Sequence, residues 1–507
     1  MIVPKAERTG ARRERCDVCV IGSGAGGAVV AAELAEAGLA VSLLEQGGNH
    51  GSADFDQRED HMFPMLFEDA GLRSTRDGAI QILQGRGVGG STVHNLGTCL
   101  RAPDPILETW ARAHDIRDLD QLADSFTRVE AGLGVSQITR EELNELNRRV
   151  ERGSGLLGYR GKIAMHNRIG CVRSGFCILG CSYDAKQSMR VTYVPRADAA
   201  GARIWPDCRA ERIEAGAGGR RVVRASLLDA GPEPQGELRV EARVVVCSAG
   251  AIGTPLLLQA SGLGGSAVGQ NLHLHPSVTV WGIFPEAIHA YYGIPQAYYI
   301  DEFLELERDP SSGTLLLPIA GFPSMLAAQL PGFGPELFSY LRHFDRLGGL
   351  LTLLHDRSAG SVEAGFGGRP SIRYALGEAD RRELASGVKH SVEILWASGA
   401  ERVIVPYHRD PLVLRPEDGT SSIDRRGLRQ GIIPLSSAHP QGSCRMGADP
   451  ASSALGSFGE LHETPGVFVA DASVFPTSLG VPPQITSAAL ADRSAHHILD
   501  RWPAFAR

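Results

Sequence analysis

The stretch that most constrains the fold of this chain is CDVCVIGSGAGGAVVAAELAEAGLAVSLLE, residues 16–45. A short apolar run of strand length precedes a glycine-rich turn, an alanine-rich run with helical spacing and a second apolar strand. Gly22, Gly24 and Gly27 form G-x-G-x-x-G. The first allows a tight turn, the second lets the backbone approach a pyrophosphate, and the third lets helix and strand pack closely. The stretch therefore predicts a Rossmann-type β–α–β unit that binds a dinucleotide.

The end of the second strand narrows the choice of dinucleotide. Glu45 lies about 20 residues after the glycines, where an acid accepts the hydroxyls of the adenosine ribose. A carboxylate there would repel the 2′-phosphate of NADP. The helix N-terminus offers free N–H groups and a positive dipole end to the pyrophosphate. NAD and FAD both remain compatible with this motif.

Composition excludes several function classes. The 507 residues are 43% hydrophobic and 21% charged, as in an ordinary globular enzyme. The formal net charge of -7 argues against a nucleic-acid partner, which needs a clustered basic face. No apolar run approaches the roughly 18 residues of a membrane span, and the charged N-terminal segment lacks the apolar core of a signal peptide. Nine irregularly spaced cysteines do not indicate a disulfide framework. We therefore expect a soluble, cytoplasmic enzyme.

Four further stretches of the sequence are informative about the fold and the site. GRGVGGSTVHNLGTCLRAP is glycine-rich enough to pack flat against a planar ligand, and VVVCSAGAIGTPLLLQASGLG predicts another strand, turn and helix. VGQNLHLHP is interpreted as a crossover between domains whose two histidines, His273 and His275, are structural. Near the C-terminus, AHPQGSCRMG precedes GVFVADASVFPTSLGVPPQITSAALADR.

In this order, the blocks resemble the glucose–methanol–choline (GMC) oxidoreductases, FAD-dependent enzymes that act mostly on alcohols. The branch of long-chain alcohol oxidases and gluconate-type dehydrogenase large subunits is the most similar. The resemblance implies an α/β fold. A Rossmann-like FAD-binding domain would be joined to a substrate domain built on an antiparallel sheet flanked by helices.

The resemblance also assigns cofactor contacts residue by residue. Side chains and backbone of the second glycine-rich stretch would lie against the isoalloxazine, Ala210 would contact adenine, and Asp471 would lie at the ribityl–pyrophosphate end. The helix that starts at Pro482 and Pro483 would direct its N-terminus at the flavin pyrimidine, where reduction accumulates negative charge. The residues assigned to the isoalloxazine are Gly89, Gly90, Ser91 and Asn95.

His439 is the predicted catalytic residue. Oxidation of an alcohol by hydride transfer to flavin N5 also requires loss of the hydroxyl proton, and a neutral imidazole is a suitable general base. His439 matches the catalytic histidine of the family. Cys444 and Arg445, in the same turn, are interpreted as structural.

The family pattern breaks at Pro482, where most members have a second His or Asn. Proline has neither a side-chain polar group nor a backbone N–H, so it cannot hold a substrate hydroxyl. Gln484 is a candidate replacement. The alternatives left open are desaturation, non-redox lyase or isomerase chemistry, and a catalytically idle subunit that binds FAD.

Three cysteines in GCVRSGFCILGC form a second unusual feature. Cys171, Cys177 and Cys181 are spaced x5 and x3, which fits zinc poorly. A packed lid with inherited cysteines, an iron–sulfur cluster, as some gluconate-type dehydrogenases hold there, and a redox-active pair all remain open; no metal site is predicted.

The order of the blocks suggests a domain division. We expect a lid at 106–185, a substrate domain at 276–435, and an FAD-binding domain assembled from 14–105, 186–275 and 436–502. Apolar stretches in the substrate domain, together with the resemblance, favour an apolar or amphipathic alcohol over a sugar. The other partner would be O2 or another external electron acceptor, and the protein would be a monomer or a homodimer.

Overall fold

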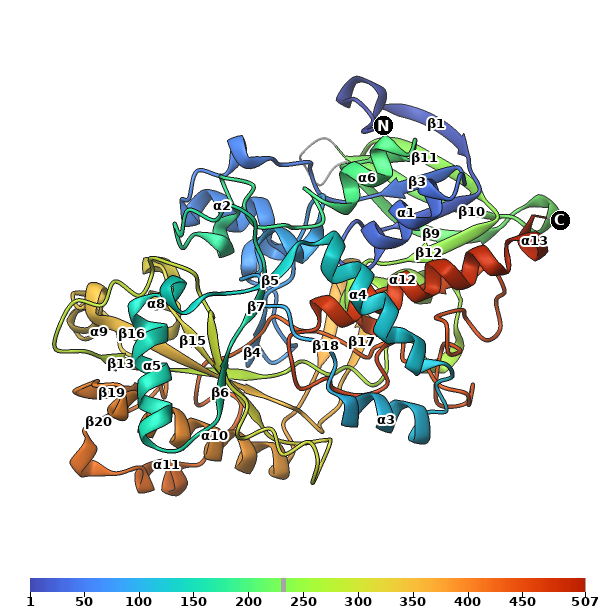
Figure 1. Ribbon diagram of the computed structural model, residues 1–507. Coiled ribbons are helices and arrows are strands. Elements are labelled where there is room, and N and C mark those ends of the chain that lie inside the picture. The colour runs from blue at the N-terminus through green and yellow to red at the C-terminus, as the bar shows by residue number, and fades with distance from the viewer. Residues whose placement is uncertain (229–233, 507) are drawn as a thin grey trace.

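The computed structural model describes residues 1–228 and 234–506 (Figure 1). Its first layer is a five-stranded sheet in which each neighbouring pair is parallel. Nearly all of its side chains are buried, which is expected of a parallel sheet covered on both faces. The strands, in spatial order, are β22 (Val467–Val469), β12 (Val244–Cys247), β2 (Val18–Ile21), β3 (Val41–Leu44) and β8 (Arg203–Trp205).

Three helices follow strands of this sheet. The predicted β–α–β unit is confirmed as β2, α1 (Gly27–Glu36) and β3, and β12 runs into α7 (Gly250–Ser261). After β22 the chain enters α12 (Gln484–Asp500), while α6 (Tyr193–Ala199) packs on α1. Gly26 is a glycine that the motif does not name. A Cβ there would lie 1.8 Å from the carbonyl oxygen of Ala470, so this position admits no larger residue.

A four-stranded sheet lies beside the first. The order is β1 (Gly10–Arg15), β11 (Pro234–Ala242), β10 (Arg221–Leu228) and β9 (Cys208–Ala215), with β1 parallel to β11 and the other pairs antiparallel. The sequence GARRER of β1 has no apolar alternation and its side chains are mostly exposed. Pairing with β11, rather than burial, therefore accounts for this strand.

The largest sheet has nine strands and forms the other end of the molecule (Figure 1). Its pairs are antiparallel except β21–β4, which is parallel. Helices α10 (Glu378–Ala397) and α5 (Glu145–Leu156) pack against it. The main path is β20 (Leu412–Leu414), β19 (Arg402–Val405), β13 (Ser277–Ile283), β16 (Leu347–Leu354), β15 (Thr314–Ile319), β14 (Tyr298–Ile300) and β6 (Gly161–Ile163), with β21 (Leu435–Ser437) on β13 and β4 (Ile80–Ile82) on β21.

These sheets confirm the expected α/β class, with a Rossmann-like part and a mainly antiparallel sheet flanked by helices. Two strands of the large sheet lie wholly outside the segment 276–435, and β21 straddles its end. β4 lies in the first segment expected for FAD binding, and β6 lies in the expected lid. The chain thus crosses between the two halves more often than the order of motifs indicates.

The remaining elements connect the two halves. Helix α3 (Asp104–Ala113) is tied to the C-terminal part of the chain, because Trp110 Nε1 donates to Thr477 Oγ1 at 2.8 Å. Helix α4 (Leu122–Gly132) packs on α12. The other helices and strands are α2 (Glu59–Leu66), α8 (Pro323–Gln329), α9 (Pro335–Leu341), α11 (Ser421–Arg426), α13 (Trp502–Phe505), β5 (Val135–Gln137), β7 (Met165–Asn167), β17 (Ser361–Ala364) and β18 (Pro370–Arg373).

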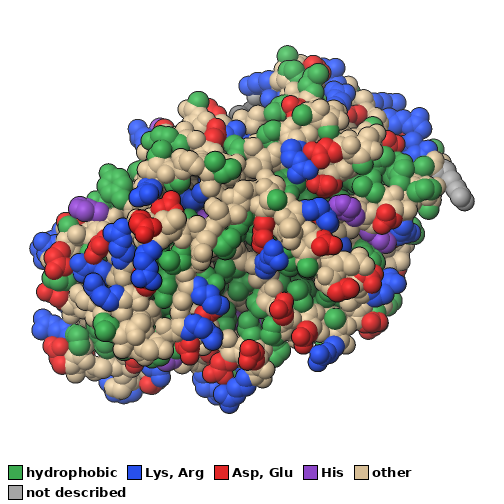
Figure 2. Space-filling model, in the orientation of Figure 1, with side chains coloured by type: hydrophobic (Ala, Val, Ile, Leu, Met, Phe, Trp, Pro, Cys, Tyr) green, Lys and Arg blue, Asp and Glu red, His purple; other side chains and the backbone are tan. Residues whose placement is uncertain are grey.

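Charges of both signs are interspersed on the face shown in Figure 2. Along the described parts of the chain, no helix combines the length and the apolar character that a bilayer span requires.

Candidate active site

A cavity of about 580 Å³ extends from the glycine turn after β2 to one face of the large sheet. Its size is typical of a ligand site. Twelve of the predicted site residues line it, although they come from segments more than 400 residues apart. They are Gly22, Gly24, Glu45, Gly90, Ser91, Asn95, Ala210, His439, Asp471, Pro482, Pro483 and Gln484.

The other two predicted glycines serve packing. A Cβ on Gly27 would lie 1.9 Å from the carbonyl oxygen of Gly22, and one on Gly89 would meet Val93 and Arg190. Gly24 differs, because a Cβ there meets no protein atom nearer than 4.0 Å. The space in front of Gly24 therefore belongs to the cavity.

Glu45 ties together the loops around the glycine turn. Its carboxylate accepts hydrogen bonds from the backbone N–H (3.1 Å) and hydroxyl (2.7 Å) of Ser23, and from the backbone N–H groups of Gly47 (2.9 Å) and Gly87 (3.3 Å). Burial raises the pKa of Glu45 above its ordinary value, against these hydrogen bonds. Contact with a ribose stays a prediction for this residue.

Asp471 holds the N-terminus of α7. Its carboxylate accepts from the backbone N–H of Gly250 (2.9 Å), the hydroxyl of Thr254 (2.6 Å) and the backbone N–H of Ser473 (2.8 Å). Burial raises the pKa of Asp471. A carboxylate is stabilised at this place because the start of a helix carries partial positive charge.

Asn95 and Gln484 join the second glycine-rich stretch to the start of α12. The amide of Asn95 donates to Gln484 Oε1, and Gln484 Nε2 donates to Cys99 Sγ at 3.7 Å. Both polar ends of Gln484 are thus engaged by the protein. Pro482 lies beside it in the cavity wall and offers no polar side-chain atom.

His439 lies beside a second histidine, His275. His439 lies two residues after β21, which pairs with the start of β13 through Ser436 and Ser277, and His275 lies two residues before β13. The Nδ1 atoms are 3.2 Å apart, and the rings are nearly perpendicular at 89°. Burial lowers the pKa of His439 to about 4, so its ring is neutral at neutral pH. Burial and the neighbouring His439 lower the pKa of His275 well below its ordinary value.

Hydrogen bonds assign the protons of this pair. The backbone N–H of Gly480 donates to His275 Nε2 at 2.9 Å, so neutral His275 carries its proton on Nδ1. That proton points to His439 Nδ1, which accepts it. Neutral His439 therefore carries its own proton on Nε2, for which the described residues supply no hydrogen-bond partner. In the resting state, His439 is a hydrogen-bond donor.

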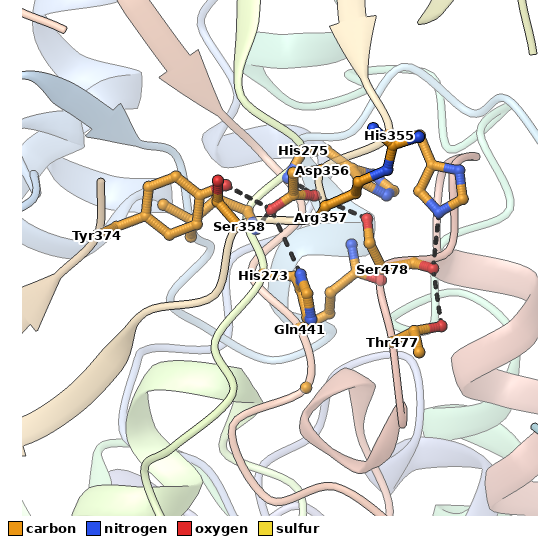
Figure 3. A network of polar contacts seen from close by, with 12 residues as sticks. His273, His275, His355, Asp356, Arg357, Ser358, Tyr374, Gln441, Thr477 and Ser478 are labelled. Atoms are coloured by element: carbon orange, nitrogen blue, oxygen red, sulfur yellow. Dashed lines mark hydrogen bonds and ion pairs between the residues drawn. The ribbon is translucent and has the colours of Figure 1, made fainter. Parts of the chain in front are cut away.

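A buried carboxylate holds the segment that carries His275 (Figure 3). Asp356 accepts from the backbone N–H groups of Leu274 (3.0 Å) and His275 (3.2 Å), and from the hydroxyls of Tyr374 (2.6 Å) and Ser478 (2.7 Å). Burial would raise the pKa of Asp356, but His273, whose Nδ1 lies 3.6 Å from Asp356 Oδ2, together with His275 and the Tyr374 hydroxyl, holds it below its ordinary value. The network ties the crossover at His275 to the loop that ends at Gly480.

The large sheet contributes the apolar wall of the cavity. Because side chains alternate between faces of a strand, Leu317 and Ile319 of β15 and Leu351 and Leu353 of β16 point into it together. Thr279 of β13 and Ser277 beside His275 add hydroxyls at the same face. The wall is thus apolar with a polar edge at the histidine pair.

Among the described residues, the three clustered cysteines do not converge on a single metal ion. All are free thiols, and the one group of metal-capable side chains that converges among the described residues is Glu33, Asp492 and His496. Arg196 and Arg128 already pair with Glu33 (3.0 Å) and Asp492 (2.6 Å). This grouping concerns a single ion, so the iron–sulfur alternative for Cys171, Cys177 and Cys181 stays open.

Sequence patterns missed two residues of the site. His275 was interpreted as structural, yet it contacts His439 and lines the cavity. Asp356 was not singled out at all. His273 and His275 have the spacing of two residues on one face of an extended segment. This spacing is the sequence signal that could have placed His275 in the site.

Comparisons with known proteins agree with this geometry. A Rossmann turn that opens into a cavity is the geometry of a dinucleotide-binding protein. An NAD(P)-binding Rossmann-like domain model matches residues 20–66, and models of the GMC oxidoreductase family match residues 63–277 and 356–491. The chain belongs to the GMC oxidoreductase family.

Individual relatives and structures support the assignment. An uncharacterized GMC-type oxidoreductase of Mycobacterium tuberculosis is 33% identical over 94% of this chain and 75% of its own length. The long-chain-alcohol oxidase FAO4B of Arabidopsis thaliana is 30% identical over 96% and 68%. The fold resembles pyridoxine 4-oxidase from Mesorbium loti (TM-score 0.70, 19% identity, covering 96% and 99%) and formate oxidase from Aspergillus oryzae (0.71, 17%, 98% and 100%).

FAD is the cofactor of this family fold, and the residues present fit it. Two buried polar atoms of the cavity wall, His94 Nε2 and Asn95 Oδ1, lack a hydrogen-bond partner among the described residues. Buried polar atoms are normally satisfied, so both indicate a polar ligand. The open space at Gly24 admits the close approach of a pyrophosphate.

Proposed function

We propose that the protein oxidises the CH–OH group of an apolar or amphipathic alcohol to a carbonyl, with His439 as the general base. The observation that carries the proposal is the position of His439 in one cavity with the Rossmann turn and an apolar sheet face. Bound FAD supplies the hydride acceptor at N5. The residues that would hold it are the lining residues predicted to bind the cofactor: Gly22, Gly24, Glu45, Gly90, Ser91, Asn95, Ala210, Asp471, Pro482 and Pro483.

Proton transfer is the step for which this chain supplies a group. The hydroxyl proton must leave as the carbonyl forms, and a positioned histidine contributes typically ~10²–10⁴-fold. His439 is neutral at neutral pH because burial lowers its pKa to about 4. To accept a proton at Nε2, His439 must carry its own proton on Nδ1. Because the Gly480 N–H keeps the proton of His275 on Nδ1, the contact between the two Nδ1 atoms must then open.

Support for the substrate class comes from the cavity wall and from named relatives. Leu317, Leu351 and Leu353 form an apolar surface that a sugar would not match. Several relatives about 30% identical to the chain carry the name long-chain-alcohol oxidase. An alcohol with an aliphatic tail would place that tail on the sheet and its hydroxyl at the histidine pair.

A second candidate function is favoured by the resting proton arrangement. His439 Nε2–H is suited to donate to a carbonyl oxygen, as desaturation or non-redox lyase and isomerase chemistry requires. Pro482, which offers no second polar group, fits such a reaction equally well.

The two functions are distinguished by an anaerobic titration of the holoenzyme with matched alcohols and ketones of increasing chain length. Bleaching of the oxidised flavin bands by an alcohol, stronger for longer chains, supports alcohol oxidation. Conversion of a carbonyl compound without bleaching supports the non-redox function, and bleaching by a saturated ketone supports desaturation. Reoxidation in air against added quinones then identifies the acceptor.

We also propose the division of roles expected from the motifs. Residues 14–105, 186–275 and 436–502 bind FAD, 276–435 bind the substrate, and 106–185 cover the site. The contribution of β4 and β6 to the large sheet makes the halves interdependent, so we expect neither to fold alone.

A further inference from the structure

Gln296 brings a hydrogen-bond donor without a partner to the cavity. The residue lines the same cavity as His439 and is only 8% exposed. Thr98 donates to its side-chain Oε1 at 3.3 Å, whereas the described residues supply no hydrogen-bond partner for its Nε2. Because buried polar groups are normally hydrogen-bonded, the free N–H of Gln296 indicates an acceptor on a ligand.

Neighbouring hydrogen bonds fix which end of the Gln296 amide is free. Burial lowers the pKa of His166 well below its ordinary value, so its ring is neutral. Arg168 Nε donates to His166 Nδ1 at 2.8 Å, and the ring proton is therefore on Nε2. This N–H is shared between the carbonyl oxygen of Gln296 (3.1 Å) and Thr98 Oγ1 (3.4 Å). Since Thr98 accepts from His166, its own proton is directed to Gln296 Oε1, and the amide nitrogen is left for a ligand.

The backbone of Gln296 is held in an uncommon conformation. Its φ is 50°, in the left-handed region that residues other than glycine seldom adopt. Contacts on both sides keep it there: His166 donates to the carbonyl of Gln296, and the backbone N–H of Ala164 donates to the carbonyl of Ala297 at 2.9 Å. Such conformations cluster at ligand-binding and active sites, where the surrounding structure imposes them. The backbone thus agrees with a ligand contact at Gln296.

A short series of contacts joins Gln296 to Pro482, where the family pattern breaks. Thr98, which holds Gln296, precedes Cys99, whose Sγ accepts from Gln484 Nε2 at 3.7 Å. Gln484 lies two residues after Pro482, and apart from Cys99 all of these residues line the cavity. Both polar ends of Gln484 are engaged by the protein, whereas Gln296 keeps a free N–H. Gln296 is therefore the better replacement for the missing polar group.

We propose that Gln296 binds the oxygen atom of the reacting group and supplies the second polar contact that Pro482 cannot make. This role rests on the proposed function, since it names a residue that holds the substrate of the same site. An amide N–H donates to a hydroxyl or a carbonyl oxygen. The hydrogen bond strengthens as the hydroxyl proton passes to His439, because negative charge then develops on the oxygen. Gln296 thus selects a neutral oxygen compound and stabilises it as its proton leaves.

Binding of two matched probes tests this role without turnover. The oxidised holoenzyme is titrated with methyl butyl ketone and with hexane, and the change in flavin absorbance gives a dissociation constant for each. Gln296→Met keeps the length of the side chain but has no donor, so it should bind the ketone roughly tenfold more weakly than wild type and hexane equally well. Gln296→Asn, which is one methylene shorter and tolerates a positive φ, should show the same loss. Unchanged ketone binding in both variants overturns the proposal, as does a wild-type holoenzyme that binds neither compound.

Flavin reduction by the best alcohol gives a second readout. Gln296→Met should keep its FAD content and melting temperature, while the limiting rate of reduction falls by roughly 10²-fold, as when a donor to a developing negative charge is removed. Gln57→Met is the matched control, because Gln57 also has a positive φ (65°) but does not line the cavity, and it should change neither the rate nor ketone binding. A wild-type rate in Gln296→Met overturns the proposal. If no alcohol reduces the flavin but ketone binding weakens in Gln296→Met, alcohol oxidation fails and the assignment of Gln296 stands.

Discussion

His275 and His439 face each other through Nδ1 atoms 3.2 Å apart, and the backbone N–H of Gly480 fixes the proton of the first. The arrangement unites three segments that are far apart in the sequence: the end of the crossover before β13, the turn after β21 and the loop before α12. It makes His275 a positioning residue for His439. Its predicted role can be measured separately from that of His439.

Replacing His275 tests this role. His275→Phe keeps a ring but removes both hydrogen bonds, so His439 should lose its orientation and flavin reduction should slow by roughly 10²-fold. His275→Gln, which can still donate to His439, should recover part of the rate. Anaerobic stopped-flow reduction measures both, and a shifted pH profile in His275→Phe should accompany the loss. Equal rates in all three proteins would show that His275 only fills space.

Substitutions at two glycines distinguish an effect on cofactor binding from an effect on folding. A Cβ on Gly24 meets no protein atom nearer than 4.0 Å, so Gly24→Ala should fold normally yet bind FAD at least tenfold more weakly. Gly26→Ala forces a clash with Ala470 and should lower the melting temperature of the apoprotein. Gly155→Ala, in α5 with open space around it, is the control and should not destabilise. Unchanged FAD affinity in Gly24→Ala would contradict the assigned cofactor site.

Gln484 is expected to be a minor contributor. Because its amide is engaged by Asn95 and Cys99, Gln484→Ala should slow flavin reduction about tenfold or less, far below the loss expected for His439→Ala. Steady-state kcat and KM for the preferred substrate would provide the comparison. A loss as large as that of His439→Ala would make Gln484 the replacement for the group that Pro482 lacks.

Acid should destabilise the protein partly through His94. Burial lowers its folded-state pKa to about 3, so His94 is neutral in the fold but takes up a proton on unfolding below about pH 6.5. This contribution to stability is constant above about pH 6.5 and is lost as the pH falls toward 3. His94→Phe cannot titrate and keeps the packing on Phe67, whose ring centroid is 3.9 Å away. Compared as apoproteins, the stability of wild type relative to His94→Phe should therefore fall by up to about 1.4 kcal/mol per pH unit in this range. A pH-independent difference between their urea midpoints would refute the shift.

Some elements of the fold can be predicted from the sequence and others cannot. The β2–α1–β3 unit follows from glycine spacing and apolar runs, since both are local properties of the chain. Twelve predicted residues line the cavity because the family motifs carry them in a known order. The sequence does not place His275 beside His439, because the two lie 164 positions apart and meet only through the pairing of β21 with β13. The charged strand β1 has no apolar alternation to reveal it, and the joining of β4 and β6 to the large sheet is a tertiary event that no local pattern encodes.

The central claim is that His439 removes the proton of an alcohol whose carbon loses hydride. The most direct test is the rate of anaerobic flavin reduction by the best alcohol in wild type and in His439→Ala, with FAD content measured in both. We predict full FAD content in the variant and a rate lower by ~10²–10⁴-fold. Reduction at the wild-type rate in His439→Ala would contradict the account.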